Sequence, residues 1–271
     1  MTAQPLGFGL AAGAPEETIT AAALAAERAG LLSFWLTYPS PPLSGDGLLR
    51  LSAAARATSC IDLGIGVIPL HEHAATAIIN DLAEYQIPVE RLRLGIGSGP
   101  IAGSLDRVRT ATRELRREVD CELTIAALGP RMCTLAGEIA DSVLLNWLDP
   151  NHARQSAETV RDAARRVGRR APLIYAYVRV AYGLGSDARL EREARLYSSL
   201  PFYAAHFERM GLKANEVAIH AATQADLRAR LDTWRGVVDE VIIRALPGQD
   251  TIADTLAILD VCIEAFEVVR E

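Results

Sequence analysis

The stretch from Thr124 to Trp147 constrains the fold of this chain more than any other. It begins inside an apolar run, residues 123–128, which has the length and composition of a buried strand. Gly129-Pro130 ends that strand and starts a helix, because proline suits the first helical position. The helix ends at Asp141-Ser142, and residues 143–147 are predicted to form a second buried strand. A strand, helix and strand joined by tight turns form a βαβ unit, which predicts a parallel sheet.

The same alternation continues through the whole chain. Eight strands are predicted, at residues 6–11, 33–37, 61–68, 91–97, 123–128, 143–147, 173–181 and 239–245. Eight strands that alternate with helices over 271 residues predict an α/β fold, a (β/α)8 TIM barrel, as one domain over 1–271.

One segment, at about 182–238, breaks this period between the seventh and eighth strands. We expect a helical insertion of three helices there, which would overhang the active-site face as a substrate lid. The alternative is that its aromatic residues only seat the extra helices on the barrel.

Composition excludes several classes of protein. The net charge of −6 gives no broad positive field for nucleic acid or an anionic membrane. No apolar run reaches the ~20 residues of a membrane span, and the N-terminus lacks the pattern of a signal peptide, so a cytoplasmic protein is expected. The widely spaced cysteines stand in apolar contexts and are expected to be buried, reduced thiols; they are Cys60, Cys121, Cys133 and Cys262.

Candidate reactive residues must lie at the C-terminal ends of the strands, where TIM barrels carry their sites. The turn at Gly129 presents free amides at a helix N-terminus, a natural place for a phosphate, and Arg131 would add a full charge. His71-Glu72-His73 is the one cluster of metal-ligand types, but its spacing favours a polar loop, so no metal site is expected. The single lysine, Lys213, lies in the insertion and not at a strand end. Such a barrel is typical of an enzyme whose cofactor does the chemistry.

Five segments in order along the chain resemble the bacterial luciferase-like enzymes, in particular the branch that uses the deazaflavin coenzyme F420. They are FGLAAG at 8–13, AAERAGLLSFWLT at 25–37, RATSCIDLGIGVIPLHEH at 56–73, LRLGIGSG at 92–99 and AALGPRMCTLAGEIADSVLLNWL at 126–148.

The resemblance implies a set of site residues. A bulge in the third strand, with a non-prolyl cis peptide at Gly66-Val67, would support the back of the cofactor ring. The remaining cofactor contacts, chiefly to its phosphate, would come from Gly97, Ser98, Gly99, Ala127, Gly129, Pro130 and Arg131. The expected substrate pocket comprises His71, Asn146, Trp147, Tyr177 and Arg179, with a core aromatic as the alternative for Trp147.

The chain departs from that pattern after the second strand. Many deazaflavin-dependent relatives have Asp-His there, near the reacting edge of the ring, whereas this sequence has Thr37-Tyr38-Pro39. Tyr38 is therefore the candidate catalytic proton donor, with packing as the alternative.

The leading hypothesis is an F420-dependent oxidoreductase that transfers a hydride to or from a small organic substrate. The alternatives are an FMN-dependent monooxygenase, supplied with reduced flavin by a separate reductase, and a barrel that binds a flavin or small ligand without turnover. The resemblance also implies a homodimer, formed through the helices after the second and third strands.

Overall fold

The computed structural model describes residues 4–38, 46–101 and 103–266. The strands are β1 (Leu6–Ala11), β2 (Ser33–Thr37), β3 (Asp62–Pro69), β4 (Leu92–Gly97), β5 (Glu122–Ala127), β6 (Ser142–Asn146), β7 (Leu173–Tyr182), β8 (Ile219–Ala221) and β9 (Glu240–Ala245). The α-helices are α1 (Glu16–Arg28), α2 (Gly47–Ala57), α3 (Ala75–Glu84), α4 (Ser104–Glu118), α5 (Pro130–Ile139), α6 (Pro150–Arg166), α7 (Ser186–Ser199), α8 (Pro201–Met210), α9 (Gln224–Asp232) and α10 (Ile252–Phe266). The predicted eighth strand is β9.

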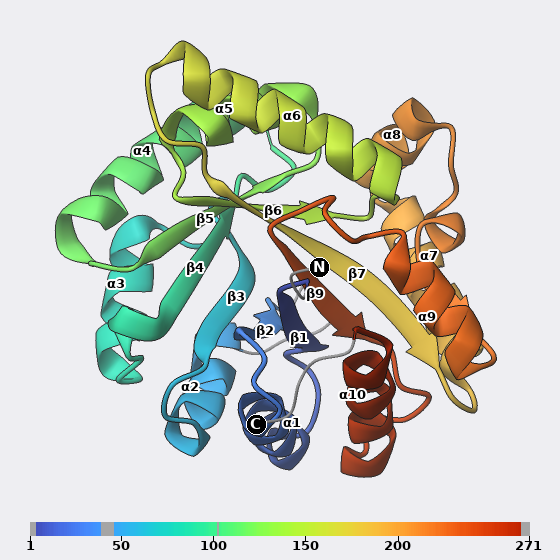
Figure 1. The fold of residues 1–271 in the computed structure, drawn as a ribbon. Coiled ribbons are helices and arrows are strands. Elements are labelled where there is room, and N and C mark those ends of the chain that lie inside the picture. The colour runs from blue at the N-terminus through green and yellow to red at the C-terminus, as the bar shows by residue number, and fades with distance from the viewer. Residues whose placement is uncertain (1–3, 39–45, 102, 267–271) are drawn as a thin grey trace.

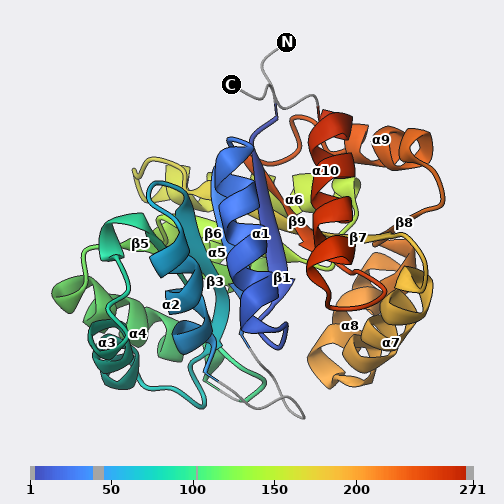
Figure 2. The same cartoon turned by 90° about the horizontal axis from the view of Figure 1, so that it is seen from below.

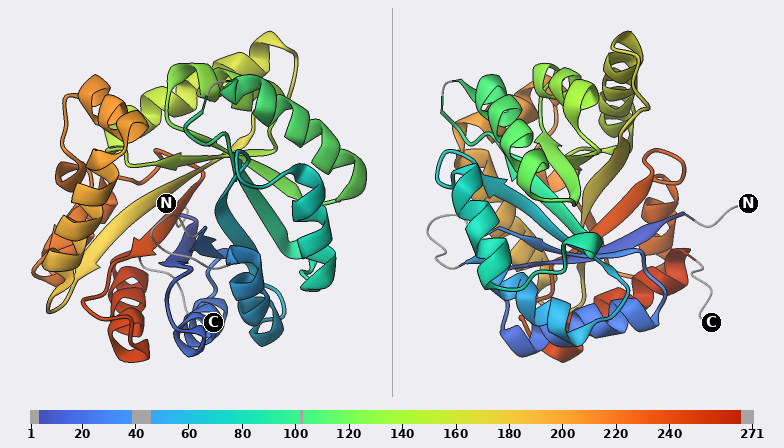
Figure 3. Two further views of the ribbon diagram at one scale, coloured as in Figure 1. Left: turned by 180° about the vertical axis from the view of Figure 1, so that it is seen from behind. Right: turned by 90° about the vertical axis from the view of Figure 1, so that its left-hand side faces the viewer.

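β1 to β7 and β9 form a closed parallel barrel. The strands pair in chain order from β1 to β7, β7 pairs with β9, and β9 returns to β1. Figures 1 and 3 show the helices arranged around the outside of these strands. The predicted TIM barrel is therefore confirmed.

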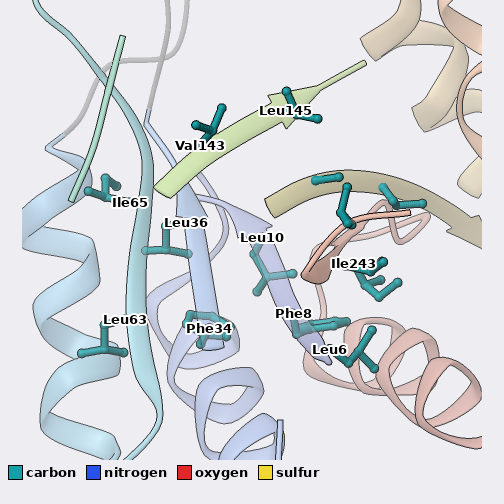
Figure 4. Packing of buried hydrophobic residues seen from close by; sticks show 14 of the residues in the cluster. Leu6, Phe8, Leu10, Phe34, Leu36, Leu63, Ile65, Val143, Leu145 and Ile243 are labelled. Carbon is teal, nitrogen blue, oxygen red and sulfur yellow. The ribbon is translucent and has the colours of Figure 1, made fainter. Parts of the chain in front are cut away.

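Alternate residues of each strand point outward and form the main core between strands and helices. Phe8, Phe34, Leu63 and Ile243 belong to this layer and are fully buried, and Figure 4 shows them on neighbouring strands. Full burial of such a side chain contributes ~1.5–3 kcal/mol, so this layer supplies most of the stability of the barrel.

The inward-pointing residues form a smaller cluster inside the barrel. Its members are Trp35, Leu144, Tyr175, Tyr177 and Ile242, with Val67 packed against them. Glycines on β3 make room for these large rings. A Cβ at Gly64 would collide with the indole of Trp35, and one at Gly66 would collide with the hydroxyl of Tyr177. The interior is filled because small residues on one wall face aromatic residues on the other.

The N-terminal ends of the strands carry a hydrogen-bonded polar network. Arg93 of β4 donates from Nη1 to Glu240 Oε2 at 2.6 Å and from Nη2 to Asp62 Oδ2 at 2.7 Å. Ser33 donates to the other Glu240 oxygen and accepts from Trp35 Nε1 at 2.7 Å. This network closes the end of the barrel opposite the candidate site.

The insertion between β7 and β9 contains α7, α8 and α9, as predicted. The structure also places there a short strand that sequence reasoning missed. β8 extends the sheet beyond β7, with Ile219 beside Val180, and its three residues are too few to give a period-two signal. Figure 2 shows α7 and α8 at the opposite end of the barrel from the start of β1, which is the end where the strands finish.

The expectation that every cysteine is buried is wrong for Cys60, which is exposed in the turn between α2 and β3. Cys133 and Cys262 are buried, Cys121 is partly buried, and all four are free thiols. The exposure of Cys60 follows from its place in a connecting turn, where apolar neighbours in sequence do not guarantee burial. Within the described residues, no helix combines the length and apolarity that a membrane span requires.

Candidate functional site

The third strand is bulged at the position that the resemblance identified. The register between β3 and β4 shifts between Ile65 and Ile68, and the peptide bond between Gly66 and Val67 is cis, as predicted. Val67 packs toward the inner cluster, where a Cβ at Gly97 would lie 2.8 Å from Val67 Cγ2. The glycine on β4 therefore leaves the space that the bulged residue occupies.

The turn after β4 lies beside the loop after β3. The amide of Leu70 donates to Gly97 O at 2.8 Å, and the hydroxyl of Ser98 donates to Gly99 O at 3.0 Å. Gly99 has a φ of +71°, and a Cβ there would collide with the imidazole of His71. Glycine is thus required both by the left-handed backbone and by the close approach of His71.

The N-terminus of α5 is open toward the end of the barrel. Gly129 is its N-cap, with extended backbone and no capping side chain, and its carbonyl accepts from the amides of Met132 and Cys133. Pro130 and Arg131 are exposed in the first turn, while Ala127 is buried at the end of β5. An uncapped helix N-terminus beside a cation favours an anion.

A second arginine, Arg209 of α8, lies at the same helix N-terminus. Its Nη2 donates to Leu128 O at 3.2 Å, and a Cβ built on Gly129 would lie 3.6 Å from that nitrogen. Sequence reasoning missed this residue because it is about eighty positions away. In the sequence, this position is marked only as a basic residue that follows the aromatic residues of the insertion.

His206 links Arg209 to the end of β6. Arg209 Nη2 lies 3.2 Å from His206 Nδ1, and His206 Nε2 lies 2.9 Å from Trp147 O. A guanidinium only donates, so Nδ1 accepts and Nε2 carries the proton that it donates to the carbonyl. Burial, reinforced by Arg209, lowers the pKa of His206 and keeps this ring neutral.

Three charged side chains meet at the ends of β7 and β9. Arg179 and Arg244 are register partners on these strands, and both contact Glu193 of α7. Arg179 Nε donates to Glu193 Oε1 at 2.8 Å, and Arg244 Nη2 donates to Oε2 at 3.4 Å. Burial alone would raise the pKa of Glu193, but Arg244 and Arg179 outweigh it and the pKa is lowered. Glu193 and Arg244 were absent from the predicted pocket.

Asn146 and Trp147 join this cluster from β6. Asn146 Oδ1 accepts from Arg179 Nη1 at 2.7 Å, and its Nδ2 donates to Tyr203 Oη at 3.1 Å. The guanidinium of Arg179 lies over the Trp147 ring, 3.6 Å from its centre. The structure thus brings together three of the five predicted pocket residues.

Trp147 also seats the insertion on the barrel. It has a φ of +55° and is 1% exposed, and its ring contacts Tyr197 and Phe207 of the insertion. The aromatic residues of α7 and α8 therefore pack on Trp147, which agrees with the seating interpretation. Packing does not exclude a role in a pocket. The Nε1 of Trp147 is buried without a hydrogen-bond partner among the described residues, so the ring keeps one donor for a ligand.

Tyr177 lies one layer deeper, beside the bulge. Its hydroxyl is the atom that a Cβ on Gly66 would meet, and it is buried with no hydrogen-bond partner. Burial raises the pKa of Tyr177, although Arg244 and Arg179 both act to lower it. Its hydroxyl therefore keeps its proton at neutral pH.

Tyr38 lies away from this inner group. Its ring packs edge-on against His73 at 5.0 Å and beside Gly47, in the layer between strands and helices. Burial, with a contribution from Asp46, raises the pKa of Tyr38 to about 12. The role of Tyr38 as proton donor stays a prediction.

His71 lies closer to the predicted phosphate loops. Its Nε2 is 3.0 Å from Glu72 Oε1, and its Nδ1 is buried without a partner beside Gly99. Among the described residues, no group of three or more histidines, cysteines or carboxylates is arranged to hold a metal ion.

Several solved structures share this architecture. An F420-dependent secondary alcohol dehydrogenase in complex with an F420–acetone adduct matches with a TM-score of 0.75 and 13% identity, over 99% of this chain and 98% of that one. The coenzyme F420-dependent tetrahydromethanopterin reductase from Methanopyrus kandleri matches with a TM-score of 0.74 and 16% identity, over 100% of this chain and 98% of that one. The oxygenating constituent of 3,6-diketocamphane monooxygenase from Pseudomonas putida, in complex with FMN, matches with a TM-score of 0.68 and 11% identity, over 100% of this chain and 98% of that one. At these identities the likeness establishes the fold.

Family membership comes from the sequence itself. The sequence model described as luciferase-like monooxygenase matches residues 4–118 and 107–245, which together span most of the chain. The matched range includes the bulged β3, the turn after β4, the N-terminus of α5 and the charged cluster on β7 and β9. This chain belongs to the luciferase-like monooxygenase family, a family of enzymes.

Proposed function

We propose that this enzyme is an F420-dependent oxidoreductase, which transfers a hydride between the deazaflavin and a small organic substrate. The observation that carries the proposal is the uncapped N-terminus of α5, with Arg131 in its first turn and Arg209 beside Gly129. The helix dipole and two guanidinium groups together favour a phosphate, which both F420 and FMN carry.

The residues around this point fit a flavin-like group. Gly97 and Gly129 keep the ends of β4 and β5 free of side chains, and Val67 offers an apolar surface on the bulge. The unpartnered hydroxyl of Tyr177 lies next to Gly66. We assign the phosphate to the turns after β4 and β5, and the ring to the bulge of β3.

When bound, the reduced cofactor supplies a hydride. The residues of the chain itself position the reacting groups and determine which side chains keep their protons. Tyr177 retains its proton because burial raises its pKa, so it acts as a hydrogen-bond donor to a substrate oxygen. Glu193 stays ionised between two arginines, so it fixes their positions and is a poor base. The insertion covers this side of the barrel end and limits the access of water.

F420 is placed before FMN because the five segments quoted above resemble the branch of the family that uses F420. The solved structures that share this fold include both F420-dependent enzymes and an FMN complex. A flavin-dependent monooxygenase is the second candidate, since the matching family is described by that activity. It would need reduced FMN from a separate reductase, and oxygen.

Parallel titrations of the purified chain with F420 and FMN, followed by calorimetry, test the assignment. We expect F420 to bind at least tenfold more tightly. Tighter binding of FMN would replace the proposal with the monooxygenase, and binding of neither would contradict both.

Two variants locate the phosphate. Gly129→Val should weaken cofactor binding about tenfold and leave the melting temperature unchanged, because the extended backbone at Gly129 accepts any residue. Arg131→Ala should weaken binding more at low salt than at high salt. The control is Arg165→Ala, which removes an exposed side chain from the last turn of α6, at the opposite end of the barrel from the first turn of α5. Unchanged affinity in both α5 variants would remove the phosphate from this helix.

A further inference from the structure

The cluster at the ends of β7 and β9 buries more positive than negative charge. Arg179 and Arg244 have side chains that are 1% and 5% exposed, and they share one carboxylate, that of Glu193. A third arginine near Glu193, Arg189, is paired with Asp250 Oδ1 at 2.8 Å and adds no net charge. The remaining hydrogen-bond and ring partners of Arg179 are neutral: Asn146, Trp147 and Tyr197.

This excess charge is costly for a purely structural cluster. A buried cation without a counterion destabilises the folded state, because its lost hydration is not offset. The ring of Trp147 offsets part of that cost for Arg179 through its contact with the guanidinium. Among the residues that the structure describes, Arg244 has no such ring contact, and its Nη1 donates to a carbonyl, Ala245 O. The excess charge is therefore concentrated on Arg244.

Unpartnered donors gather around the same point. Arg244 Nε, Tyr177 Oη and Trp147 Nε1 are each buried and have no hydrogen-bond partner within the described part of the chain. Tyr177 and Arg179 are two residues apart on β7 and lie on the same face, Arg244 is the register partner of Arg179, and the Trp147 ring lies under the Arg179 guanidinium, so these groups are neighbours. Buried donors are almost always paired in folded proteins, so a group of unpaired ones calls for an acceptor, which a water, an ion or a ligand supplies.

We propose that the substrate carries a carboxylate or an equivalent anionic group, which binds at Arg244 and accepts hydrogen bonds from Arg244 Nε and Tyr177 Oη. This inference rests on the proposed function, because it takes the C-terminal end of the barrel as the active site. The phosphate of the cofactor is assigned to β4 and β5, across the barrel from β9, so the anionic group belongs to the substrate. The donors are shut off from solvent in this structure, so binding of the group requires the side chains that cover them to rearrange.

Matched acids and amides test this inference with the full chain. Acetate, hexanoate and benzoate are compared with acetamide, hexanamide and benzamide by calorimetric titration at pH 7.5, with and without saturating F420. At this pH each acid is fully ionised, and each pair differs in charge but little in size. We expect at least one acid to bind about tenfold more tightly than its amide.

Two variants assign the preference to the cluster. Arg244→Gln should abolish the preference for the acid. The control, Arg195→Ala, removes a positive charge from the same helix as Glu193, and its exposed side chain lies outside the cluster, so the preference should persist. Circular dichroism verifies that both variants fold. If Arg244→Gln does not fold, Tyr177→Phe, which should reduce the preference at least threefold, replaces it.

The outcomes separate this inference from the proposed function. Equal binding of every acid and its amide, or a preference that survives Arg244→Gln, overturns the anionic substrate while the cofactor titration still stands. An acid preference in a chain that binds neither F420 nor FMN supports the anion site and overturns the cofactor assignment.

Discussion

At the N-terminal ends of the strands, Arg93 donates to two carboxylates, Asp62 and Glu240, whereas at the C-terminal ends Arg179 and Arg244 share Glu193 alone. The two ends also differ in their hydroxyl groups. Tyr175 Oη donates to Glu122 Oε1 at 2.8 Å, while Tyr177, two residues further along β7, has no partner for its hydroxyl.

The difference indicates a division of roles along one barrel. At the N-terminal end, most polar side chains satisfy one another and thereby fix the strands, with Arg93 Nε and Arg169 Nη1 as the buried exceptions among the described residues. At the C-terminal end, Arg244, Tyr177, Trp147 and His71 each bury an atom that lacks a partner. In TIM barrels, residues at the N-terminal ends of the strands contribute to stability, and residues at the C-terminal ends form the active site.

The largest expected effect comes from breaking the N-terminal network with Arg93→Met. It leaves the buried Glu240 with the Ser33 hydroxyl but without its cation, so we expect a loss of about 3–5 kcal/mol in the free energy of unfolding, measured with urea. The control, Arg109→Met, removes an exposed ion pair with Glu138 and should cost less than ~1 kcal/mol. A similarly small loss in the free energy of unfolding for Arg93→Met would show that the network does not stabilise the fold.

A smaller effect is expected at the C-terminal end from Glu193→Gln. The variant keeps a hydrogen-bond acceptor but leaves two buried cations without an anion, so unfolding should become easier by about 2 kcal/mol. At the same time, affinity for benzoate should rise, because more uncompensated charge faces the ligand. Glu191→Gln, on the same helix but exposed, is the control and should change neither quantity. Weaker benzoate binding in Glu193→Gln would contradict the division of roles.

The smallest effect is a pH dependence at the N-terminal end. Glu27 accepts hydrogen bonds from the amides of Ser59, Cys60 and Ile61. Burial alone would raise its pKa, but these amides outweigh it and lower the pKa from 4.5 to about 2. The folded-state pKa is thus depressed, so its contribution is complete above about pH 4.5 and is lost as the pH falls toward 2.

Glu27→Gln should therefore lower stability by about 1 kcal/mol at pH 6 and flatten the stability curve between pH 4.5 and 2. The measurement is urea unfolding at several pH values, beside Glu17→Gln, an exposed residue of the same helix. An unchanged slope in that pH window would show that the three amides do not stabilise the carboxylate.

Local periodicity predicted the barrel, because each strand and helix carries its own signal. The turn at Gly129 was found for a related reason, since it depends on residues within one short segment, whereas the bulge at Gly66-Val67 was expected only from the resemblance to a known family. The three residues of β8 were missed because such a strand is defined by pairing with β7 and not by its own sequence.

The charged cluster was predicted only in part. Asn146, Arg179 and Tyr177 lie on strands whose positions the pattern fixes, so they could be assigned to the barrel end. Glu193 and Arg209 come from the insertion, and only tertiary packing brings them to the ends of β7 and β5. Nothing in the local sequence distinguishes them from the other charged residues of α7 and α8.

The most direct test compares Tyr175→Phe with Tyr177→Phe, two identical changes on one strand. Tyr175→Phe removes a hydrogen bond to Glu122 and should lower the free energy of unfolding by about 1–2 kcal/mol. Tyr177→Phe removes a buried hydroxyl that has no partner, so stability should stay within about 0.5 kcal/mol or rise. An equal loss in both variants would contradict the claim that the two ends of the barrel serve stability and binding separately.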